Sequence, residues 1–173
     1  MIVRPGRHED VEHILDLGAQ MHEEGAYAFL PFDREKVRQL ILAMIGDPET
    51  QCVLVAEEGD RPVGGLLGYL DGYFFCDEKL ACDLVLFIER PHRGGTAAAR
   101  LIRAFRQWAT ERGARELCLA ISTGVEADRI GRLYERMGLR RVGGVYKQRL
   151  SAATSPDSSW PRRRAARPSL PGS

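Results

Sequence analysis

The first apolar positions of the chain recur at helical spacing in two separate segments. In residues 10–21 apolar side chains return every three or four positions, as in an amphipathic helix that packs one stripe inward. A short strand over residues 2–4 precedes this segment. Leu30-Pro31-Phe32 interrupts the spacing, and Asp33 stands at an N-cap position before a second periodic segment, 37–45. The pattern therefore predicts one strand followed by two helices.

The next part of the chain is rich in Val, Leu, Tyr and Phe, which favour strands. Two such runs cover residues 52–56 and 63–75, and the segment 58–62 between them, Glu-Gly-Asp-Arg-Pro, has the residues of a hairpin turn. A third run covers residues 81–89. These runs predict an antiparallel meander.

After the meander, the hydrophobic period returns to that of a helix. Apolar residues from Ala98 to Ala109 mark a helix that ends before Gly113, a residue suited to the left-handed position after a helix. The run from Leu117 to Ile121 is apolar at almost every position, which predicts a strand buried on both faces. This part of the chain therefore reads as a helix followed by a core strand.

The last periodic segment, from Ile130 to Met137, predicts a helix stopped by Gly138, and residues 142–150 read as a final strand. The predicted order is βααβββαβαβ. A meander followed by a βαβ crossover predicts an α/β fold with a mixed, mostly antiparallel sheet and helices on both of its faces.

Length and composition predict one folded domain and a tail. A chain of 173 residues with 44% hydrophobic content supplies one core, which we assign to residues 1–150. Residues 151–173 are rich in Ser, Pro and Arg, and we expect them to be disordered. The formal charge is +1, but the tail holds four arginines and one aspartate, which leaves the folded part slightly acidic. The folded part is therefore not expected to bind nucleic acid, and the short basic run at Trp160–Arg164 is a small patch.

Other features of the sequence limit location and metal content. The longest apolar stretches are strand-sized, far below the roughly 20 residues of a membrane helix, and the first residues lack the build of a signal peptide. We therefore expect a soluble, cytoplasmic protein without membrane contact. The four cysteines form no C-x-x-C pair, which argues against a metal site or a disulfide framework.

The segment from Glu89 to Ala98 joins a strand to a helix through small residues. Successive backbone N–H groups in such a turn, with the helix N-terminus, form a site for an anion such as a pyrophosphate. Neither the dinucleotide pattern G-x-G-x-x-G nor the Walker pattern G-x-x-x-x-G-K-[ST] is present, so nicotinamide and nucleoside triphosphate ligands are disfavoured. An ordinary strand-to-helix turn is the competing interpretation.

Two motifs resemble those of the GNAT acetyltransferases. The run Arg93-Gly94-Gly95-Thr96-Ala97-Ala98 resembles their R/Q-x-x-G-x-G/A acetyl-CoA loop, and Leu133-Tyr134-Glu135-Arg136-Met137-Gly138-Leu139 resembles their Leu-Tyr-Glu-x-x-Gly-Phe signature. The resemblance covers residues 2–150. It departs from the family at Thr96, where the middle glycine usually stands, and at Arg90, where a proline often precedes the loop. An alternative alignment, with His92 in the Arg/Gln position, would place Arg100 where the family has an aliphatic residue. The alignment with Arg93 in the Arg/Gln position is preferred for that reason.

The resemblance implies an N-acetyltransferase that uses acetyl-CoA, without a metal, and transfers the acetyl group directly to a primary amine. It implies that residues 93–98 bind the coenzyme, that main-chain N–H groups near Ile88 polarise the thioester, and that Tyr134 protonates the leaving thiolate. Glu89 would be the general base, acting directly or through water. A core-packing role for Tyr134 and a solvated carboxylate at Glu89 are the alternatives.

The resemblance also places the acceptor amine, of a small molecule or a peptide, beside His22, Glu23 and Glu24, which otherwise form a solvated face. Arginines at positions 100, 103 and 106 either reach the coenzyme's ribose phosphate or are ordinary exposed residues. A homodimer is compatible with the resemblance. The competing function is a binding module that keeps the coenzyme site without catalysis, acting as a sensor or an assembly component.

Overall fold

The computed structural model describes residues 1–149. The strands are β1 (Ile2–Pro5), β2 (Gln51–Glu58), β3 (Arg61–Gly72), β4 (Lys79–Ile88) and β5 (Ala114–Cys118). The α-helices are α1 (Val11–Glu24), α2 (Arg34–Gly46), α3 (Ala97–Glu111) and α4 (Ala127–Arg136), and short 3-10 turns cover His8–Asp10 and Arg90–His92. Up to α4 the order of strands and α-helices is the one that the hydrophobic pattern predicts.

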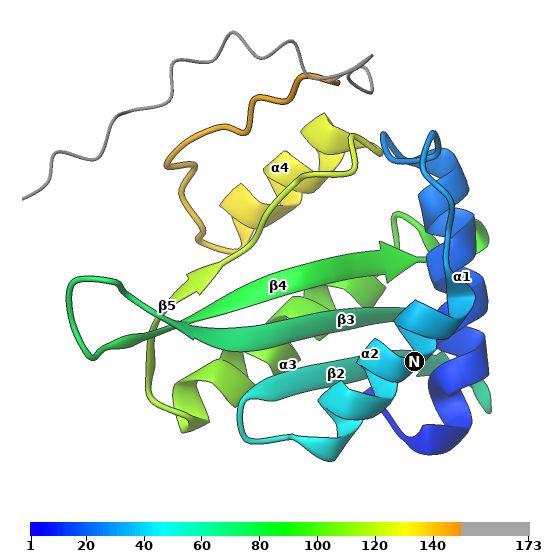
Figure 1. The fold of residues 1–173 in the computed structure, drawn as a ribbon, viewed down its shortest axis with the longest axis horizontal. Helices are drawn as coiled ribbons and strands as arrows, with labels where there is room; N and C mark the ends of the chain where they lie inside the picture. The colour runs from blue at the N-terminus through cyan, green and yellow to red at the C-terminus, as the bar shows by residue number, and fades with distance from the viewer. Residues whose placement is uncertain (150–173) are drawn as a thin grey trace, which may run out of the picture. The chain divides into compact units, whose positions relative to one another are not determined.

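The strands form one mixed sheet in the order β1-β2-β3-β4-β5 (Figure 1). Neighbouring strands from β1 to β4 are antiparallel, and β5 runs parallel to β4. Helix α3 makes the crossover between these two parallel strands, because a parallel pair cannot be joined by a tight turn. The predicted fold class, a mixed α/β sheet with a single parallel crossover, is confirmed.

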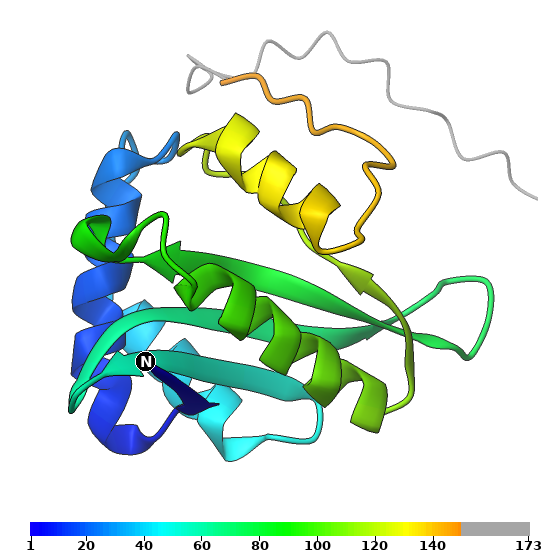
Figure 2. The ribbon, with the colours of Figure 1, turned by 180° about the vertical axis from the view of Figure 1, so that it is seen from behind.

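Helices cover both faces of this sheet, and each face has its own apolar core. On one face α1 and α2 pack against Val53, Val55 and Phe87 of the sheet (Figure 1). On the other face α3 packs its buried stripe, including Leu101 and Phe105, against the alternate sheet residues (Figure 2). The alternation of side chains along β2 sends successive residues to opposite cores, which explains why that strand is almost continuously apolar.

Three predicted helix boundaries are confirmed by local geometry. The Asp33 carboxylate accepts a 3.0 Å hydrogen bond from the Lys36 N–H, which caps α2 as predicted. Gly113, after α3, and Gly138, after α4, have φ of 76° and 85°. Both angles lie in the left-handed region that glycine adopts without the steric cost other residues incur.

The strand predicted at residues 117–121 lies earlier in the chain and is not buried. β5 covers Ala114–Cys118, and none of its residues is fully buried. The reason is its place in the sheet: β5 is the edge strand of the described sheet, so only β4 flanks it. The apolar residues 119–121 continue beyond the strand toward α4, with Ile121 36% exposed.

The predicted final strand at residues 142–150 is not found among the residues that the structure describes. Residues 142–149 take part in no strand ladder, and Val145 and Tyr146 are exposed to solvent. A strand exists through hydrogen bonds to a neighbour, so residues suited to a strand do not form one without a ladder. Leu150 and the predicted disordered tail, 151–173, lie outside the described residues.

The chain divides into two units, residues 1–142 and 143–173. All of the helices and strands named above belong to the first unit, as does every residue of the candidate site. Within residues 1–149, no helix is both long enough and apolar enough to cross a membrane.

Candidate functional site

The parallel strands β4 and β5 pair over only part of the length of β4. The pairing runs from Lys79 with Ala114 to Cys82 with Cys118, and β4 continues from Asp83 to Ile88 without β5 beside it. At the point of divergence, the Ala120 N–H donates a 2.8 Å hydrogen bond to the Asp83 carboxylate. The second half of β4 is thereby left with one side open.

Main-chain N–H groups on this open side are available to a ligand. The Glu89 N–H donates to the Val63 carbonyl of β3 at 2.9 Å, so the N–H groups of alternate residues point toward β3. Because N–H direction alternates along an antiparallel strand, the N–H groups of Leu86 and Ile88 point to the side from which β5 has departed. The Ile88 N–H, the donor that the resemblance implies, therefore points away from β3.

The loop between β4 and α3 has the geometry of an anion cradle. Gly94 has φ of 90°, and Gly94, Gly95 and Thr96 are exposed to solvent. Thr96 makes no side-chain cap to α3, so the first-turn N–H groups of a 15-residue helix, beginning at Ala97, keep their donor capacity. Ala97 is buried and Ala98 half-buried, so they anchor the helix start. A side chain at Gly95 would be built 3.4 Å from the His92 carbonyl oxygen and would enter the loop's solvent face.

Arg129 of α4 brings a positive charge to this loop. A Cβ built on Gly94 would lie 2.0 Å from the Arg129 Nη2, so the guanidinium rests directly against the glycine. Its other terminal nitrogen contacts Glu126 at 3.1 Å. The sequence analysis did not single out Arg129. It lies on α4, more than 30 residues after the loop, and only the fold brings the two together. A cation beside a helix N-terminus favours phosphate binding.

The Arg93 side chain is turned away from the cradle toward α1. Its guanidinium donates to the Ile88 carbonyl at 2.9 Å and to Glu24 at 2.7 Å. Arg90 contacts the other Glu24 oxygen at 2.8 Å. The hydrogen bond from Arg93 has the largest effect on the pKa of Glu24. Together with Arg90 it holds that pKa below its ordinary value, although desolvation of the Glu24 carboxylate acts in the opposite direction. Arg93 thus fixes the position of the loop relative to α1, and Glu24 is ion-paired rather than free.

Glu89 lies in a charged cluster at the end of the β2–β3 hairpin. Its carboxylate accepts a hydrogen bond from Arg61. The His92 Nδ1 lies 3.1 Å from Glu89 Oε2, but the two atoms are not aligned for a hydrogen bond. The His92 Nε2 lies 3.1 Å from Glu58. The base predicted from the resemblance is therefore largely buried and held by a cation.

Tyr134 of α4 is only 7% exposed, and it is close enough to Asp83, where β5 diverges from β4, to feel the charge of that carboxyl group. Burial, with a smaller contribution from the nearby Asp83, raises the pKa of its phenol well above the ordinary value. The phenol is therefore protonated at every physiological pH. One residue of the second motif is therefore close to the point where β4 and β5 diverge.

Asp83 is a second residue that the sequence analysis missed. Burial raises the pKa of its carboxyl to about 6, against the opposing hydrogen bond from the Ala120 N–H. The signal was present in the sequence: Asp83 is the one acidic residue within the apolar run from Leu80 to Ile88. A carboxyl group in such a run is costly to bury as an ion, which marks a place where charge has a role.

The C-terminal end of α1 forms the opposite wall of the opening. His22 packs its ring against Phe32, with centroids 5.4 Å apart, and Glu23 is exposed. The Ala26 N–H donates to the Thr123 carbonyl at 2.8 Å, which ties the loop after α1 to the loop after β5. Of the three predicted acceptor residues, His22 faces a cavity of about 270 Å³, Glu23 faces solvent, and Glu24 is paired with arginines.

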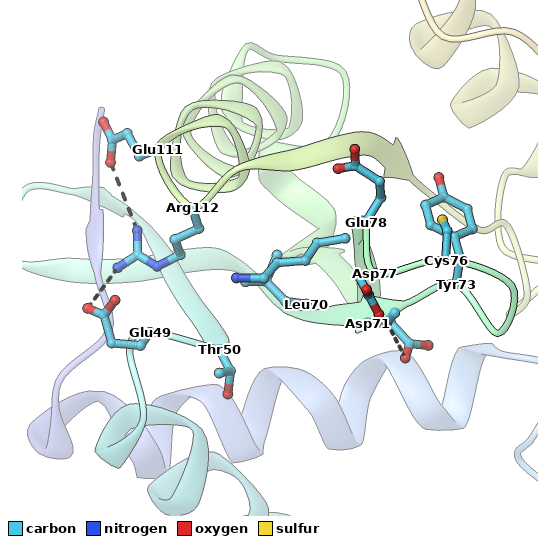
Figure 3. Close-up of a pocket in the computed structure, with 12 residues that line it drawn as sticks. Glu49, Thr50, Leu70, Asp71, Tyr73, Cys76, Asp77, Glu78, Glu111 and Arg112 are labelled. Carbon is cyan, nitrogen blue, oxygen red and sulfur yellow. Dashed lines mark hydrogen bonds and ion pairs between the residues drawn. The ribbon is translucent and has the colours of Figure 1, made fainter.

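A larger hollow of about 730 Å³ lies at the other end of the sheet, between the β3–β4 hairpin and the end of α3. Figure 3 shows Arg112 between Glu49 and Glu111 on one wall, with Asp77 and Glu78 on the opposite side. This hollow is wide and strongly acidic. It contains none of the residues of the two motifs.

The α3 arginines make contacts within the protein. Arg100 donates to the Thr96 hydroxyl at 3.2 Å and to the Met1 carbonyl at 3.3 Å, and Arg106 donates to the Met137 carbonyl at 2.7 Å. Arg106 thereby satisfies a carbonyl at the end of α4. In the described part of the chain, no group of three His, Cys, Asp or Glu side chains is arranged to hold a metal ion.

Comparisons with known proteins identify the family and support the fold. Residues 14–139 match the acetyltransferase (GNAT) family. Similar solved structures include an aminoglycoside acetyltransferase from an uncultured soil metagenomic sample, with 21% identity, a TM-score of 0.65 and coverage of 87% of this chain and 98% of that one. A ribosomal-protein-alanine N-acetyltransferase from Brucella melitensis biovar Abortus 2308 has 19% identity and a TM-score of 0.67, covering 86% and 98%.

A glucosamine-6-phosphate N-acetyltransferase from Arabidopsis thaliana has 13% identity and a TM-score of 0.68, covering 87% of this chain and 98% of its own. No curated protein matches the sequence. At these identities the solved structures support the fold, whereas the family match spans most of the described residues. The chain belongs to the GNAT acetyltransferase family.

Proposed function

We propose that this protein is an N-acetyltransferase that moves an acetyl group from acetyl-CoA to a primary amine by direct attack. The observation that carries the proposal is the opening where β4 leaves β5 after Cys82 and Cys118. The glycine loop before α3 adjoins it, and the buried Tyr134 of α4 is close to Asp83, where the two strands diverge. Each part has a separate role in the transfer.

The loop and the start of α3 fit the phosphates of the coenzyme. Gly94 and Gly95 leave room for close approach of an anion, and the first-turn N–H groups of α3 supply donors and partial positive charge. Arg129, which rests on Gly94 and is paired with Glu126, brings a guanidinium group to the same place. Bound acetyl-CoA would supply the activated acetyl thioester, and the protein would supply its orientation and the proton transfers.

The open side of β4 would stabilise charge on the acetyl carbonyl. The N–H groups of Leu86 and Ile88 point to that side, and donors placed where negative charge develops are worth several kcal/mol, about 3 for a single donor. During transfer the amine nitrogen forms a bond to the carbonyl carbon while the carbon–sulfur bond breaks. The amine loses one proton, and the thiolate gains one.

Tyr134 is the proposed donor of the thiolate proton. Its burial keeps the phenol protonated, and the same apolar surroundings raise the proton affinity of a thiolate formed beside it. Glu89, whose carboxylate Arg61 holds at the end of β4, is the proposed acceptor of the amine proton, directly or through water. Solvent then restores the phenol proton.

Replacement of Tyr134 by Phe tests this function. The substitution removes one hydroxyl and keeps the ring in the core, so folding and coenzyme affinity should stay close to those of the wild type. Loss of a general acid typically costs about 10²- to 10⁴-fold in turnover. The measurement is thiol release from acetyl-CoA in the presence of an amine, with coenzyme affinity measured by calorimetry on the same protein.

A matched substitution separates chemistry from packing. Tyr146→Phe changes the same hydroxyl at a position that is 97% exposed, so turnover should not change. Unaltered turnover in Tyr134→Phe would remove the acid role. Coenzyme binding without any amine acetylation by the wild type would favour the competing function, a non-catalytic acyl-CoA-binding module.

A further inference from the structure

An apolar cavity of about 270 Å³ lies between α1, α2 and the half of β4 that β5 does not flank. The residues around it come from segments far apart in the sequence, and most are aliphatic or aromatic. Ile14, Met21, Ile41, Leu67, Val85 and Phe87 form much of its wall. Several of them, including Ile14 and Phe87, also belong to the core on this face of the sheet.

No carboxylate lines this cavity. Among the residues that line it, the polar side chains are those of His22, Tyr27 and Thr123. The nearest acidic residue on α1 that faces inward, Glu24, is ion-paired with Arg90 and Arg93. A ligand with several ammonium groups would lose their hydration here without gaining a counter-charge.

The cavity adjoins the place where the acetyl group would react. Leu84 is the extra residue of a bulge in β4, because Val85 pairs with Leu67 and Asp83 pairs with Gly68. Its side chain lines the cavity, and it is 48% exposed. The following residues of β4 carry the N–H groups on the open side. A ligand in the cavity would therefore have its outer end beside those donors.

We infer that the acceptor is a primary amine that carries a single apolar group, such as an arylalkyl amine, and that this cavity holds the apolar group. The inference rests on the proposed function, since it names the acceptor of that same site. The cavity would hold the ring or alkyl chain, and the amine would stay at the mouth near Leu84. Polycationic amino sugars would be poor acceptors.

The size of the cavity limits the apolar group. An engineered apolar cavity of about 150 Å³ in another protein binds benzene. The cavity of about 270 Å³ is larger than that and below the range of about 300 to 1,000 Å³ that is usual for drug-sized ligands. It therefore suits a phenyl ring with a short linker, or an alkyl chain of similar volume.

Gly18 allows the cavity to be filled without loss of the fold. It lies within α1, lines the cavity, and a Cβ built on it would meet only the Phe32 ring, at an ordinary 3.7 Å. Gly18→Leu should occupy part of the cavity. Gly18→Ala is the matched control, because it gives a similar gain in helix propensity with little added volume.

The experiment compares 2-phenylethylamine with kanamycin, a polycationic amino sugar, as acceptors for the wild type and both Gly18 variants. We expect kcat/KM for 2-phenylethylamine to exceed that for kanamycin by at least about tenfold, which corresponds to 1.4 kcal/mol. Gly18→Leu should lower the value for 2-phenylethylamine by a similar factor, and Gly18→Ala, which adds only one methyl group to the cavity wall, should lower it much less. Preference for kanamycin, or no effect of Gly18→Leu, would overturn the inference.

Direct binding separates this inference from the proposed function. Calorimetry should show 2-phenylethylamine binding to the wild type and to Gly18→Ala but not to Gly18→Leu. If that pattern appears while no amine is acetylated, the cavity assignment stands as a binding site and the proposed function fails. If amines are acetylated but 2-phenylethylamine does not bind, the function stands and the inference is wrong.

Discussion

The half-buried carboxyl of Asp83 should make the stability of this protein depend on pH in a way that one substitution removes. Its pKa is raised from an ordinary 3.8 to about 6 by burial. The folded state therefore binds this proton more tightly than the unfolded state. Stability is lost as the pH rises from the unfolded to the folded pKa, and the full cost is present above about pH 6.

The size of the effect follows from the two pKa values. At about 1.36 kcal/mol for each pH unit of difference, the ionised carboxylate costs about 3 kcal/mol at pH 7.5 and about 1 kcal/mol at pH 4.5. In Asp83→Asn the side chain stays neutral, and its Oδ1 can still accept the hydrogen bond from the Ala120 N–H. The variant should therefore be more stable than the wild type, by about 2 kcal/mol more at pH 7.5 than at pH 4.5.

Urea denaturation of both proteins at the two pH values measures this difference, because carboxyl groups elsewhere contribute equally to the variant and the wild type. Asp77→Asn is the control, since its carboxylate is exposed in the β3–β4 hairpin and should show little change at either pH. A stability difference between Asp83→Asn and the wild type that is the same at both pH values would refute the argument. Loss of stability in the variant at pH 7.5 would refute it as well.

Two further substitutions test the loop and the first strand. Arg129→Ala should weaken acetyl-CoA binding several-fold in calorimetry, because the cation beside Gly94 is lost. The control Arg132→Ala, at an exposed position of the same helix, should not change the affinity. Equal affinities of the two variants would exclude Arg129 from the phosphate site. Asp10→Ala should cost about 3 kcal/mol of unfolding free energy, since it removes the partner of Arg4 from a site where the carboxylate is 4% exposed. A loss below about 1 kcal/mol in denaturation would show that this pair behaves as a surface ion pair.

The hydrophobic pattern predicted most of the fold because the sheet has an apolar core on each face. Period and capping residues placed α2, α3 and α4 and the meander, since each helix buries one stripe and each boundary has a recognisable residue such as Asp33. The strands beyond α3 were placed less well. Whether Leu117 to Ile121 is buried depends on which strand lies beside it, and that information is not local.

The candidate site also has one part that could be predicted from the sequence and another part that could not. The loop from Arg93 to Ala98 and the position of Tyr134 followed from motifs that are continuous in the sequence. The contact of Arg129 with Gly94, the ion pair of Arg93 with Glu24 and the charged cluster at Glu89 link elements far apart in the chain. Such contacts follow from packing, so no local spacing could predict them.

The most direct test of the central claim is calorimetric titration of acetyl-CoA into the wild type, Gly95→Glu and Gly72→Glu. A glutamate at Gly95 would put a negative charge into the loop that we assign to the phosphates, whereas a Cβ at Gly72 faces open space at the far end of β3. We expect the wild type and Gly72→Glu to bind with similar affinity and Gly95→Glu to show no binding while remaining folded. No binding to the wild type at millimolar acetyl-CoA, or equal binding to Gly95→Glu, would contradict the account.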